Sequence, residues 1–264
     1  MKQKYLTVLV LGFAALLYGP SKAGAQLSSF AVLGGSTVTN TATPTVVTGN
    51  LGVSPGSAVT GFPPGIVTGG TIHAADAVAA QAQSDLTTVY NNLANTSCNT
   101  DLTGQDLGGK TLTPGVYCFS TSAQLTGTLT LDAQGNPNAV FLFKIGSTLT
   151  TASASSVLLV NSASSCGVFW QVGSSATLGT GTALAGSIVA LTSITLNTGA
   201  SVDGRTLARN GAVTLDNSHV TVCSGGSGLP LGIALVPTLS GWAMIVLMGL
   251  LILSGLAVMR RRAA

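Results

Sequence analysis

Residues 175–190 read SATLGTGTALAGSIVA, and residues 193–208 read SITLNTGASVDGRTLA. When Ser175 is aligned with Ser193, the offset is 18, and the two segments agree in identity or kind at nine or more of sixteen positions. A short fixed period is typical of a repeat architecture, so each segment is predicted to form one coil of a stack. An offset of this size accommodates three short strands and their corners. The sequence therefore predicts a β-helix of triangular cross-section.

The unit Thr-Leu-x-Thr marks the coils of this predicted stack. It recurs at residues 148–151, 177–180 and 195–198, with a weaker copy at residues 214–217. Because side chains alternate along a strand, the leucines are predicted to form one inward ladder and their neighbours to point outward onto one face. The predicted outward residues are Thr148, Thr150, Thr177, Thr195, Asn197 and Thr214.

The spacing of the units is irregular in the earlier part of the chain. The sequence numbers of Leu125 and Leu149 differ by 24, and those of Leu149 and Leu178 differ by 29. Neither spacing equals the offset of 18 found later in the chain. Two explanations remain open: the earlier coils carry insertions, or the chain climbs the stack out of order.

One segment departs from the β pattern. Between Ile72 and Ala94 the apolar residues, most of them alanine, recur with helical spacing and without Gly or Pro. We expect a helix over about residues 72–94 that lies flat along a sheet, because alanine permits a close approach. The turn-rich residues 27–70 are expected to cap exposed strand edges at an end of the stack.

The N-terminal segment, residues 1–25, predicts export. Lys2 and Lys4 precede an apolar run over residues 6–17, and residues 23–25 form a small-residue cleavage site. The apolar run is short for a bilayer span, so residues 1–25 are interpreted as a signal peptide rather than an N-terminal anchor. The mature domain then comprises residues 26–223.

The segment after Cys223 predicts attachment to a membrane. Residues 224–241 form a linker and sorting motif, and residues 242–264 combine a tryptophan, an apolar stretch and three arginines. A stretch with these flanks is predicted to cross a membrane. The order VPTLSGW, apolar stretch, arginines resembles the bacterial C-terminal sorting signals called IPTL-CTERM, which implies recognition in the membrane. Val236 replaces the leading isoleucine and Gly241 a common acidic residue, so cleavage is left open.

Charge excludes one class of partner. Residues 26–223 contain four basic residues and seven aspartates but no glutamate, so the net charge of this domain is 4 − 7 = −3. The basic excess of the whole chain lies in its two terminal segments. Binding of nucleic acid needs clustered Lys and Arg, so no such partner is expected. The exterior must be covered instead by Thr, Ser, Asn, Ala and Gly.

Four cysteines in an exported chain predict two disulfides. Of the three possible pairings we favour Cys98 with Cys118 and Cys166 with Cys223. Closing the short loop between Cys98 and Cys118 would contribute about 3 kcal/mol through loop entropy. A metal site is the competing interpretation, but the sequence has no CxxC motif and its two histidines lack clustered partners. Neither a metal nor a cofactor is expected.

The face formed by the Thr-Leu-x-Thr units is nearly uncharged, since Asp216 in its last copy is its first ionisable residue. Such a face is unsuited to catalysis, and it lacks the aromatic and Arg anchors that protein partners use. It suits ice, because stiff threonine side chains hold methyl and hydroxyl groups in register, and water ordered over them can merge with the crystal lattice. The competing interpretation is that these threonines are ordinary outward residues of strands.

Several longer motifs carry a family resemblance that covers nearly everything from Leu27 to Val222. They occupy residues 30–40, 48–56, 101–109, 112–117, 139–143 and 168–173. In this order they resemble the secreted microbial ice-binding proteins. The resemblance implies an irregular, right-handed β-solenoid with an accompanying α-helix, and a protein that adsorbs to ice and inhibits its growth and recrystallisation. We expect the protein to be monomeric. These motifs are largely structural, so they identify no ice-contacting residues.

Two other functions stay open. An anchored solenoid with a plain face could be a surface adhesin or a structural envelope protein. A carbohydrate-active β-helix enzyme would need grouped acids in a groove. Asp101 and Asp106 lie in a Gly-rich turn motif, where Asp commonly caps the turn, and Asp203 with Arg205 is the only other compact polar cluster. Trp170 is expected in the core rather than in a sugar site.

Overall fold

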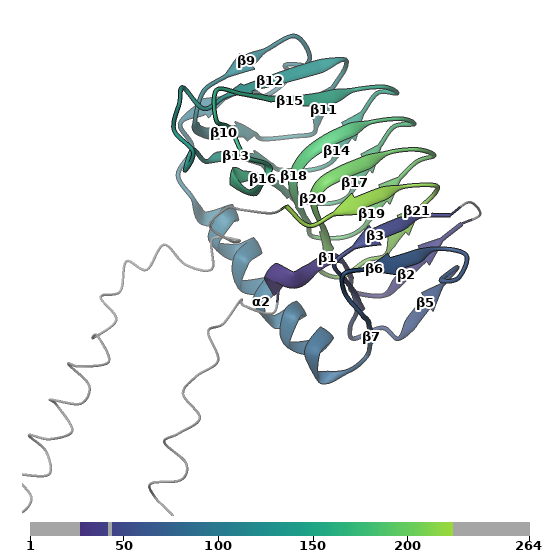
Figure 1. Ribbon diagram of the computed structural model, residues 1–264. Helices are drawn as coiled ribbons and strands as arrows, with labels where there is room; N and C mark the ends of the chain where they lie inside the picture. Colours follow the sequence, from purple (N-terminus) through teal and green to yellow (C-terminus); the bar gives the residue numbers. More distant parts are fainter. Residues whose placement is uncertain (1–26, 42–43, 224–264) are drawn as a thin grey trace, which may run out of the picture. The chain divides into compact units, whose positions relative to one another are not determined.

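The computed structural model describes residues 27–41 and 44–223, which form parallel strands and one long helix (Figure 1). This confirms the mainly β class with a single long helix. The predicted signal peptide at residues 1–25, the linker and sorting motif at 224–241 and the membrane segment at 242–264 lie outside the described residues. Within the described residues, no helix is both long and apolar enough to cross a membrane.

One sheet of seven short parallel strands forms a continuous wall of the stack (Figure 1). In order, its strands are β11 (Ala123–Leu125), β14 (Leu149–Thr151), β17 (Ala176–Leu178), β19 (Ile194–Leu196), β21 (Val213–Leu215), β2 (Thr37–Asn40) and β5 (Ala58–Thr60). Every neighbouring pair is parallel, and β17 pairs with β19 at the offset seen in the sequence, with Thr177 opposite Thr195. Each repeat is therefore one coil.

A second, 15-stranded sheet supplies the remaining strands. Its main path runs through β6 (Ile66–Thr68), β3 (Val46–Thr48), β22 (His219–Thr221), β20 (Ser201–Ala208), β18 (Ala183–Ala190), β16 (Val168–Val172), β13 (Phe141–Ile145), β10 (Gly115–Phe119) and β8 (Thr100–Asp101). Off this path lie β1 (Phe30–Gly34), β4 (Asn50–Val53), β7 (Ile72–Ala74), β9 (Thr111–Leu112), β12 (Thr128–Asp132) and β15 (Ser156–Val160), and two short 3-10 helices are η1 (Leu27–Ser29) and η2 (Ser165–Gly167).

The long strands β18 and β20 belong to two branches of this sheet, and each contains a central glycine. Gly186 and Gly204 have φ of 112° and 149°, values that residues with a Cβ rarely adopt. A Cβ on Gly204 would lie 2.1 Å from the carbonyl oxygen of Gly186. Only glycine therefore allows these strands to continue from one branch into the other while the coils remain stacked.

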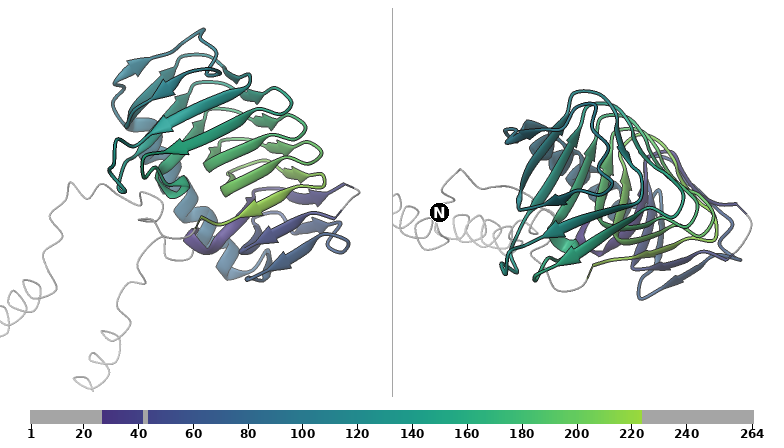
Figure 2. Two further views of the ribbon diagram at one scale, coloured as in Figure 1. Left: turned by 45° about the horizontal axis from the view of Figure 1, so that its top comes forward. Right: turned by 90° about the horizontal axis from the view of Figure 1, so that it is seen from above.

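The chain climbs the stack out of order. Strand β2 pairs with β21, and β3 pairs with β22, so the first strands of the domain extend the stack beyond its last ones. In Figure 2 the purple and blue N-terminal strands continue the series of yellow-green C-terminal strands.

The irregular spacing of Leu125, Leu149 and Leu178 has the other explanation. Strands β11, β14 and β17 are neighbours in chain order and pair at offsets of 26 and 27 residues, so these coils carry insertions relative to the later ones. The turn-rich residues 27–70 were expected to cap an end of the stack, and their strands form its terminal coils.

Helix α2 (Ala77–Asn95) covers one wall (Figure 1). Its predicted start at residue 72 is wrong, because residues Ile72–Ala74 pair with β4 as strand β7. The helix begins after Asp76, whose side chain accepts a hydrogen bond of 2.8 Å from the backbone N–H of Ala79. Its buried face packs on apolar residues of the wall, which include Leu27, Phe30, Leu33, Leu142, Phe169, Val189 and Leu207.

The core lies inside the stack. Trp170 is fully buried, as expected, and its ring stacks on Phe143 with centroids 4.1 Å apart. The indole N–H donates to the carbonyl oxygen of Ala185 at 3.0 Å, so burial leaves this polar group paired. Two disulfides close the domain in the favoured pairing, Cys98 with Cys118 and Cys166 with Cys223.

Candidate functional site

The wall of seven strands presents one row of residues in register, one from each strand. In order along the stack, the row consists of Gln124, Thr150, Thr177, Thr195, Thr214, Thr39 and Thr60. We call its six threonines the threonine file. Each is exposed or half-buried. Adjacent strands of a sheet lie about 4.8 Å apart, so the file is a regular line of methyl and hydroxyl groups.

The core forces the file outward. Thr195 lies between Ile194 and Leu196, and both neighbours are completely buried. The same alternation of buried, partly exposed and buried residues holds in β17, β19 and β21. Leu178, Leu196 and Leu215 are in register, as the predicted inward ladder requires. Because opposite faces of a strand take alternate side chains, filling the core fixes the direction of the threonines.

Four of the predicted residues lie side by side in the file: Thr150, Thr177, Thr195 and Thr214. The predicted alignment of Thr148 with Thr177 is wrong. Leu149 pairs with Ala176 rather than with Leu178, so it is Thr150 that lies opposite Thr177. The alignment of Thr-Leu units by sequence similarity placed β14 two positions away from its actual register with β17. A shift of two positions keeps the same side chains on the outer face but changes which residue of β17 lies opposite each of them.

Thr148 instead begins a flanking row of small residues, two positions before the file. Its hydroxyl donates to the hydroxyl of Ser122 at 2.8 Å. In later coils, Ser175 and Ser193 accept hydrogen bonds from backbone N–H groups of the next coil, at 3.3 and 3.2 Å. These serines lie close to the backbone, so the surface beside the file stays low and flat.

Asn197 and Asp216 lie at the opposite margin, two positions after Thr195 and Thr214. Asn197 is half-buried and follows the end of β19. The prediction that Asp216 belongs to the last copy on this face is wrong, because β2 and β5 extend the sheet beyond β21. The carboxylate of Asp216 accepts a hydrogen bond from the hydroxyl of Thr198, which holds it at the edge of the wall.

Thr39 and Thr60 were missed by the sequence analysis. Their hydroxyls are hydrogen-bonded at 3.2 Å, and they extend the file by two strands. Neither belongs to a Thr-Leu-x-Thr unit, because the residue after the threonine is Asn40 in one case and Gly61 in the other, in place of leucine. The alternation Thr37-Val38-Thr39 was the available signal, since Val38 pairs with Val213 in the inward ladder.

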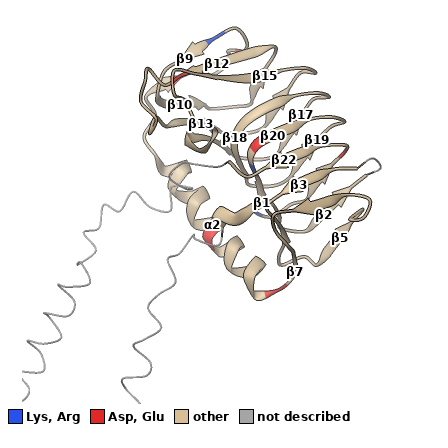
Figure 3. Ribbon diagram, in the orientation of Figure 1, with Lys and Arg blue, Asp and Glu red and all other residues tan. Residues whose placement is uncertain are grey.

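The wall is uncharged along its strands, none of which contains Lys, Arg, Asp or Glu (Figure 3). Asp106 marks one end of the wall, where it is bridged to Gln124. Desolvation of its carboxylate is outweighed by hydrogen bonds from Gly108 and Thr126, so the pKa of Asp106 lies below the usual 3.8. The carboxylate of Asp101 similarly accepts from the N–H of Thr103 at 2.8 Å. Both aspartates therefore stabilise turns, as expected.

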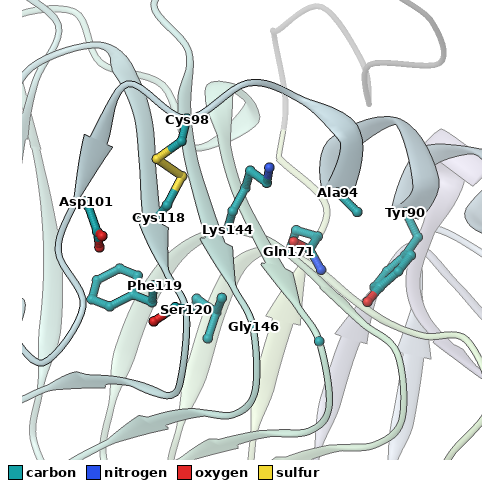
Figure 4. Close-up of a pocket in the computed structure, with 12 residues that line it drawn as sticks. Tyr90, Ala94, Cys98, Asp101, Cys118, Phe119, Ser120, Lys144, Gly146 and Gln171 are labelled. Carbon is teal, nitrogen blue, oxygen red and sulfur yellow. A yellow bond between two sulfur atoms is a disulfide. The ribbon is translucent and has the colours of Figure 1, made fainter.

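An open groove of about 580 Å³ lies near the C-terminal end of α2 (Figure 4). Its lining includes Tyr90, Lys144 and Gln171, and Lys144 donates to the backbone carbonyl of Thr96. Asp101 is the one acid among its lining residues, so the groove lacks the paired carboxylates of a glycosidase. Within residues 27–41 and 44–223, no three His, Cys, Asp or Glu side chains converge as metal ligands would.

The other polar cluster considered in the sequence, Asp203 with Arg205, is not a surface site. Arg205 is buried, with 3% of its surface exposed, whereas Asp203 is exposed. The guanidinium of Arg205 donates to the carbonyl oxygen of Ser28 at 2.9 Å. Arg205 is buried because the central glycine of β20 turns the rest of that strand toward the wall that η1 and α2 cover.

Comparison with known proteins gives a consistent result. Residues 32–221 match a family described as Ice-binding-like. The chain is 58% identical over 227 residues to an ice-binding protein of Nostoc sp. (strain HG1), which covers 84% of this chain and 83% of that protein. The crystal structure of an ice-binding protein from an Antarctic biological consortium has a TM-score of 0.72 at 46% identity, over 75% of this chain and 90% of that chain. The crystal structure of an ice-binding protein from the Antarctic ascomycete Antarctomyces psychrotrophicus has a TM-score of 0.73 at 40% identity, over 76% of this chain and 98% of that chain.

Proposed function

Because the chain belongs to the ice-binding-like family, we propose that its folded domain adsorbs to ice through the threonine file and so inhibits ice growth and recrystallisation. The observation that carries the proposal is the register of six threonines on six neighbouring parallel strands. The family is not an enzymatic one, so the carbohydrate-active alternative is set aside.

The mechanism follows from the side chains. A β-branched threonine has few rotamers, so little side-chain entropy is lost when it meets a surface. Its methyl group orders neighbouring water into cages, and its hydroxyl fixes those cages by hydrogen bonds. Each contact is weak, but a rigid file makes many at once, so adsorption becomes effectively irreversible. Ice must then bulge between adsorbed molecules, and the curved front disfavours further growth.

The form of the stack supports a planar site. We take it to be the right-handed solenoid of triangular cross-section that the sequence predicts, with the threonine file on one wall. The two ladders that join β17 to β19 and β18 to β20 share an offset of 18 residues, and these ladders and the view along the stack in Figure 2 support this interpretation. Of the walls, the one covered by α2 is unavailable to ice. Another carries Asp203 and His219, which leaves the wall with the file as the least charged.

The same proposal covers the cellular context. An exported domain that is held at the cell surface by its C-terminal segment, at least transiently, would meet ice outside the cell. We propose that it acts there as a monomer. The signal-peptide pattern of residues 1–25 and the apolar stretch in residues 242–264 support export and membrane attachment.

The direct test is an ice-partition assay on residues 26–223. The structure gives this segment its own core and both disulfides, so it is suited to expression alone. The protein is expected to be incorporated into a slowly growing ice hemisphere and to suppress recrystallisation. If it stays in the liquid while binding cells or glycans, the adhesin alternative holds instead.

A further inference from the structure

The groove near the C-terminal end of α2 contains a buried polar group that no described residue satisfies (Figure 4). Gln171 lines the groove, and only 5% of its surface is exposed. Within residues 27–41 and 44–223, its side-chain amide makes no hydrogen bond to another side chain or to the backbone. Burial of an amide without a partner costs free energy. A ligand in the groove would supply the missing partner.

Gln171 belongs to a row of residues that crosses four strands. Asp101, Cys118, Lys144 and Gln171 are in register on β8, β10, β13 and β16. Three strand spacings span about 14 Å, so the row suits a short chain of rings better than a single small molecule. The disulfide between Cys98 and Cys118 lies beside Asp101 and fixes that end of the row (Figure 4).

Tyr90 supplies an aromatic surface at the other end of the groove. In Figure 4, Asp101 and Tyr90 lie at opposite ends, with Lys144 and Gln171 between them. The guanidinium carbon of Arg209 lies 4.8 Å from the centre of the Tyr90 ring, and this cation–π contact holds the ring in place. One face of a fixed aromatic ring is a platform on which an apolar ring face can stack.

The charges of the lining oppose each other. Lys144 has three N–H donors, of which one goes to the backbone carbonyl of Thr96, so two remain for a ligand. The carboxylate of Asp101 is exposed and accepts further hydrogen bonds besides that from Thr103. Asp101 would repel an anion and Lys144 a cation. The ligand that fits both is neutral and carries donors and acceptors on neighbouring atoms.

A saccharide has this chemistry. Each of its hydroxyls donates and accepts, so two adjacent hydroxyls match the amide of Gln171, which also does both, and its ring can stack on Tyr90. An extended peptide is instead bound along a free strand edge, whereas the strand of Gln171 is paired on both sides, with β13 and β18. We propose that the groove binds a short, neutral oligosaccharide.

This site adds a function to adsorption on ice. The groove lies on the wall that α2 covers, and the threonine file lies on another, so one domain can hold a saccharide while its threonines meet ice. Asp101 is the one acid among the lining residues, so the saccharide is bound without being hydrolysed.

Binding of neutral trisaccharides to residues 26–223 in liquid water tests the proposal. Cellotriose, maltotriose and laminaritriose are the probes, and titrations followed by NMR give the dissociation constants. At least one probe is expected to bind. Gln171→Met is expected to weaken that binding about tenfold, as the loss of one or two hydrogen bonds would. The same variant is expected to keep its stability, because methionine fills a similar volume and removes an unpaired amide.

Gln83→Met is the matched control. The amide of Gln83 donates to the carbonyl oxygen of Ala208 at 3.1 Å, and Gln83 does not line the groove. This variant is expected to show the reverse pattern, with a lower free energy of unfolding and an unchanged dissociation constant. Tyr90→Leu is expected to weaken binding, and Tyr90→Phe, which keeps the ring, is expected to retain it.

Each other outcome contradicts the proposal. If none of the three trisaccharides binds, or if Gln171→Met binds as tightly as the unsubstituted domain, the groove is not a saccharide site. Tighter binding of anionic trigalacturonic acid, or of an acetylated triglycine amide, would show that its ligand belongs to another class. Because these measurements need no ice, a domain that stays out of ice would overturn the proposed function and leave the saccharide site standing.

Discussion

Arg205 has a structural role that only the folded chain explains. Its guanidinium bonds the carbonyl oxygen of Ser28, the hydroxyl of Ser187 and the sulfur of Cys223. Desolvation by burial lowers the pKa of this side chain. One buried cation therefore joins the beginning of the domain to its last disulfide, although Ser28 and Cys223 lie at opposite ends of the described chain.

Replacing Arg205 by alanine is expected to lower the free energy of unfolding by about 3 kcal/mol, through the cavity and the acceptors left unpaired. Arg205→Met is expected to cost less, because it refills the space without a buried charge. Urea unfolding monitored by circular dichroism measures both. Equal stability of Arg205→Ala and the unsubstituted domain would contradict this role.

Asp76 makes the helix start sensitive to acid. The carboxylate of Asp76 accepts a hydrogen bond from the backbone N–H of Ala79 and makes a second one with the ring of His73. These contacts, the one from Ala79 first, lower the pKa of Asp76 below its usual 3.8. A lowered folded-state pKa stabilises the fold above pH 3.8, and this contribution is lost as the pH falls through the folded value.

The stability difference between the unsubstituted domain and Asp76→Ala is therefore expected to be largest at neutral pH and to shrink below pH 3.8. Thermal midpoints recorded over a series of pH values check this. Asp76→Asn serves as the control, because asparagine also caps a helix but does not titrate. If the stability difference between the unsubstituted domain and Asp76→Ala does not vary with pH, the charge of the carboxylate does not contribute to the stability of the fold.

At the level of elements, the two disulfides close loops of different length. The sequence separation is 20 for Cys98 and Cys118, and 57 for Cys166 and Cys223. Loop entropy predicts losses of about 3 and about 4 kcal/mol when each pair is replaced by serine. Denaturant midpoints of the two double variants measure which disulfide contributes more to the free energy of unfolding. A larger loss for the pair Cys98 and Cys118 would contradict an entropic origin.

The elements also show what the sequence can predict. The short period of the later coils, the inward leucines and the helix follow from patterns within single segments. The pairing of Leu149 with Ala176 does not, because it depends on the length of the intervening chain and on the volume available in the core. The start of α2 was misplaced because Ile72 has an apolar side chain that suits either a strand or a helix.

At the level of the whole molecule, the order of the coils was beyond prediction. The sequence of residues 37–40 does not predict that β2 pairs with β21, because this pairing joins positions far apart in the chain, such as Val38 and Val213. The helix makes the arrangement possible. Its 19 residues span about 28 Å at about 1.5 Å each, and six strand spacings span about 29 Å. One helix thus carries the chain from one end of the stack to the other.

The same arrangement decides the extent of the candidate site. Because β2 and β5 continue the sheet, the file gains Thr39 and Thr60, which no local repeat reveals. Four of the six threonines in the file were available from the sequence, and their common outward direction followed from alternation alone.

Incorporation into ice of two matched variants tests the central claim most directly. Thr195→Tyr places a large ring in the middle of the file. Thr88→Tyr makes the same change at an exposed position of α2, a helix that covers a different wall from the one that carries the file. With both variants folded, the account predicts that Thr88→Tyr enters a slowly growing ice hemisphere as the unsubstituted domain does, and that Thr195→Tyr is incorporated far less. Equal incorporation of the two variants would contradict it.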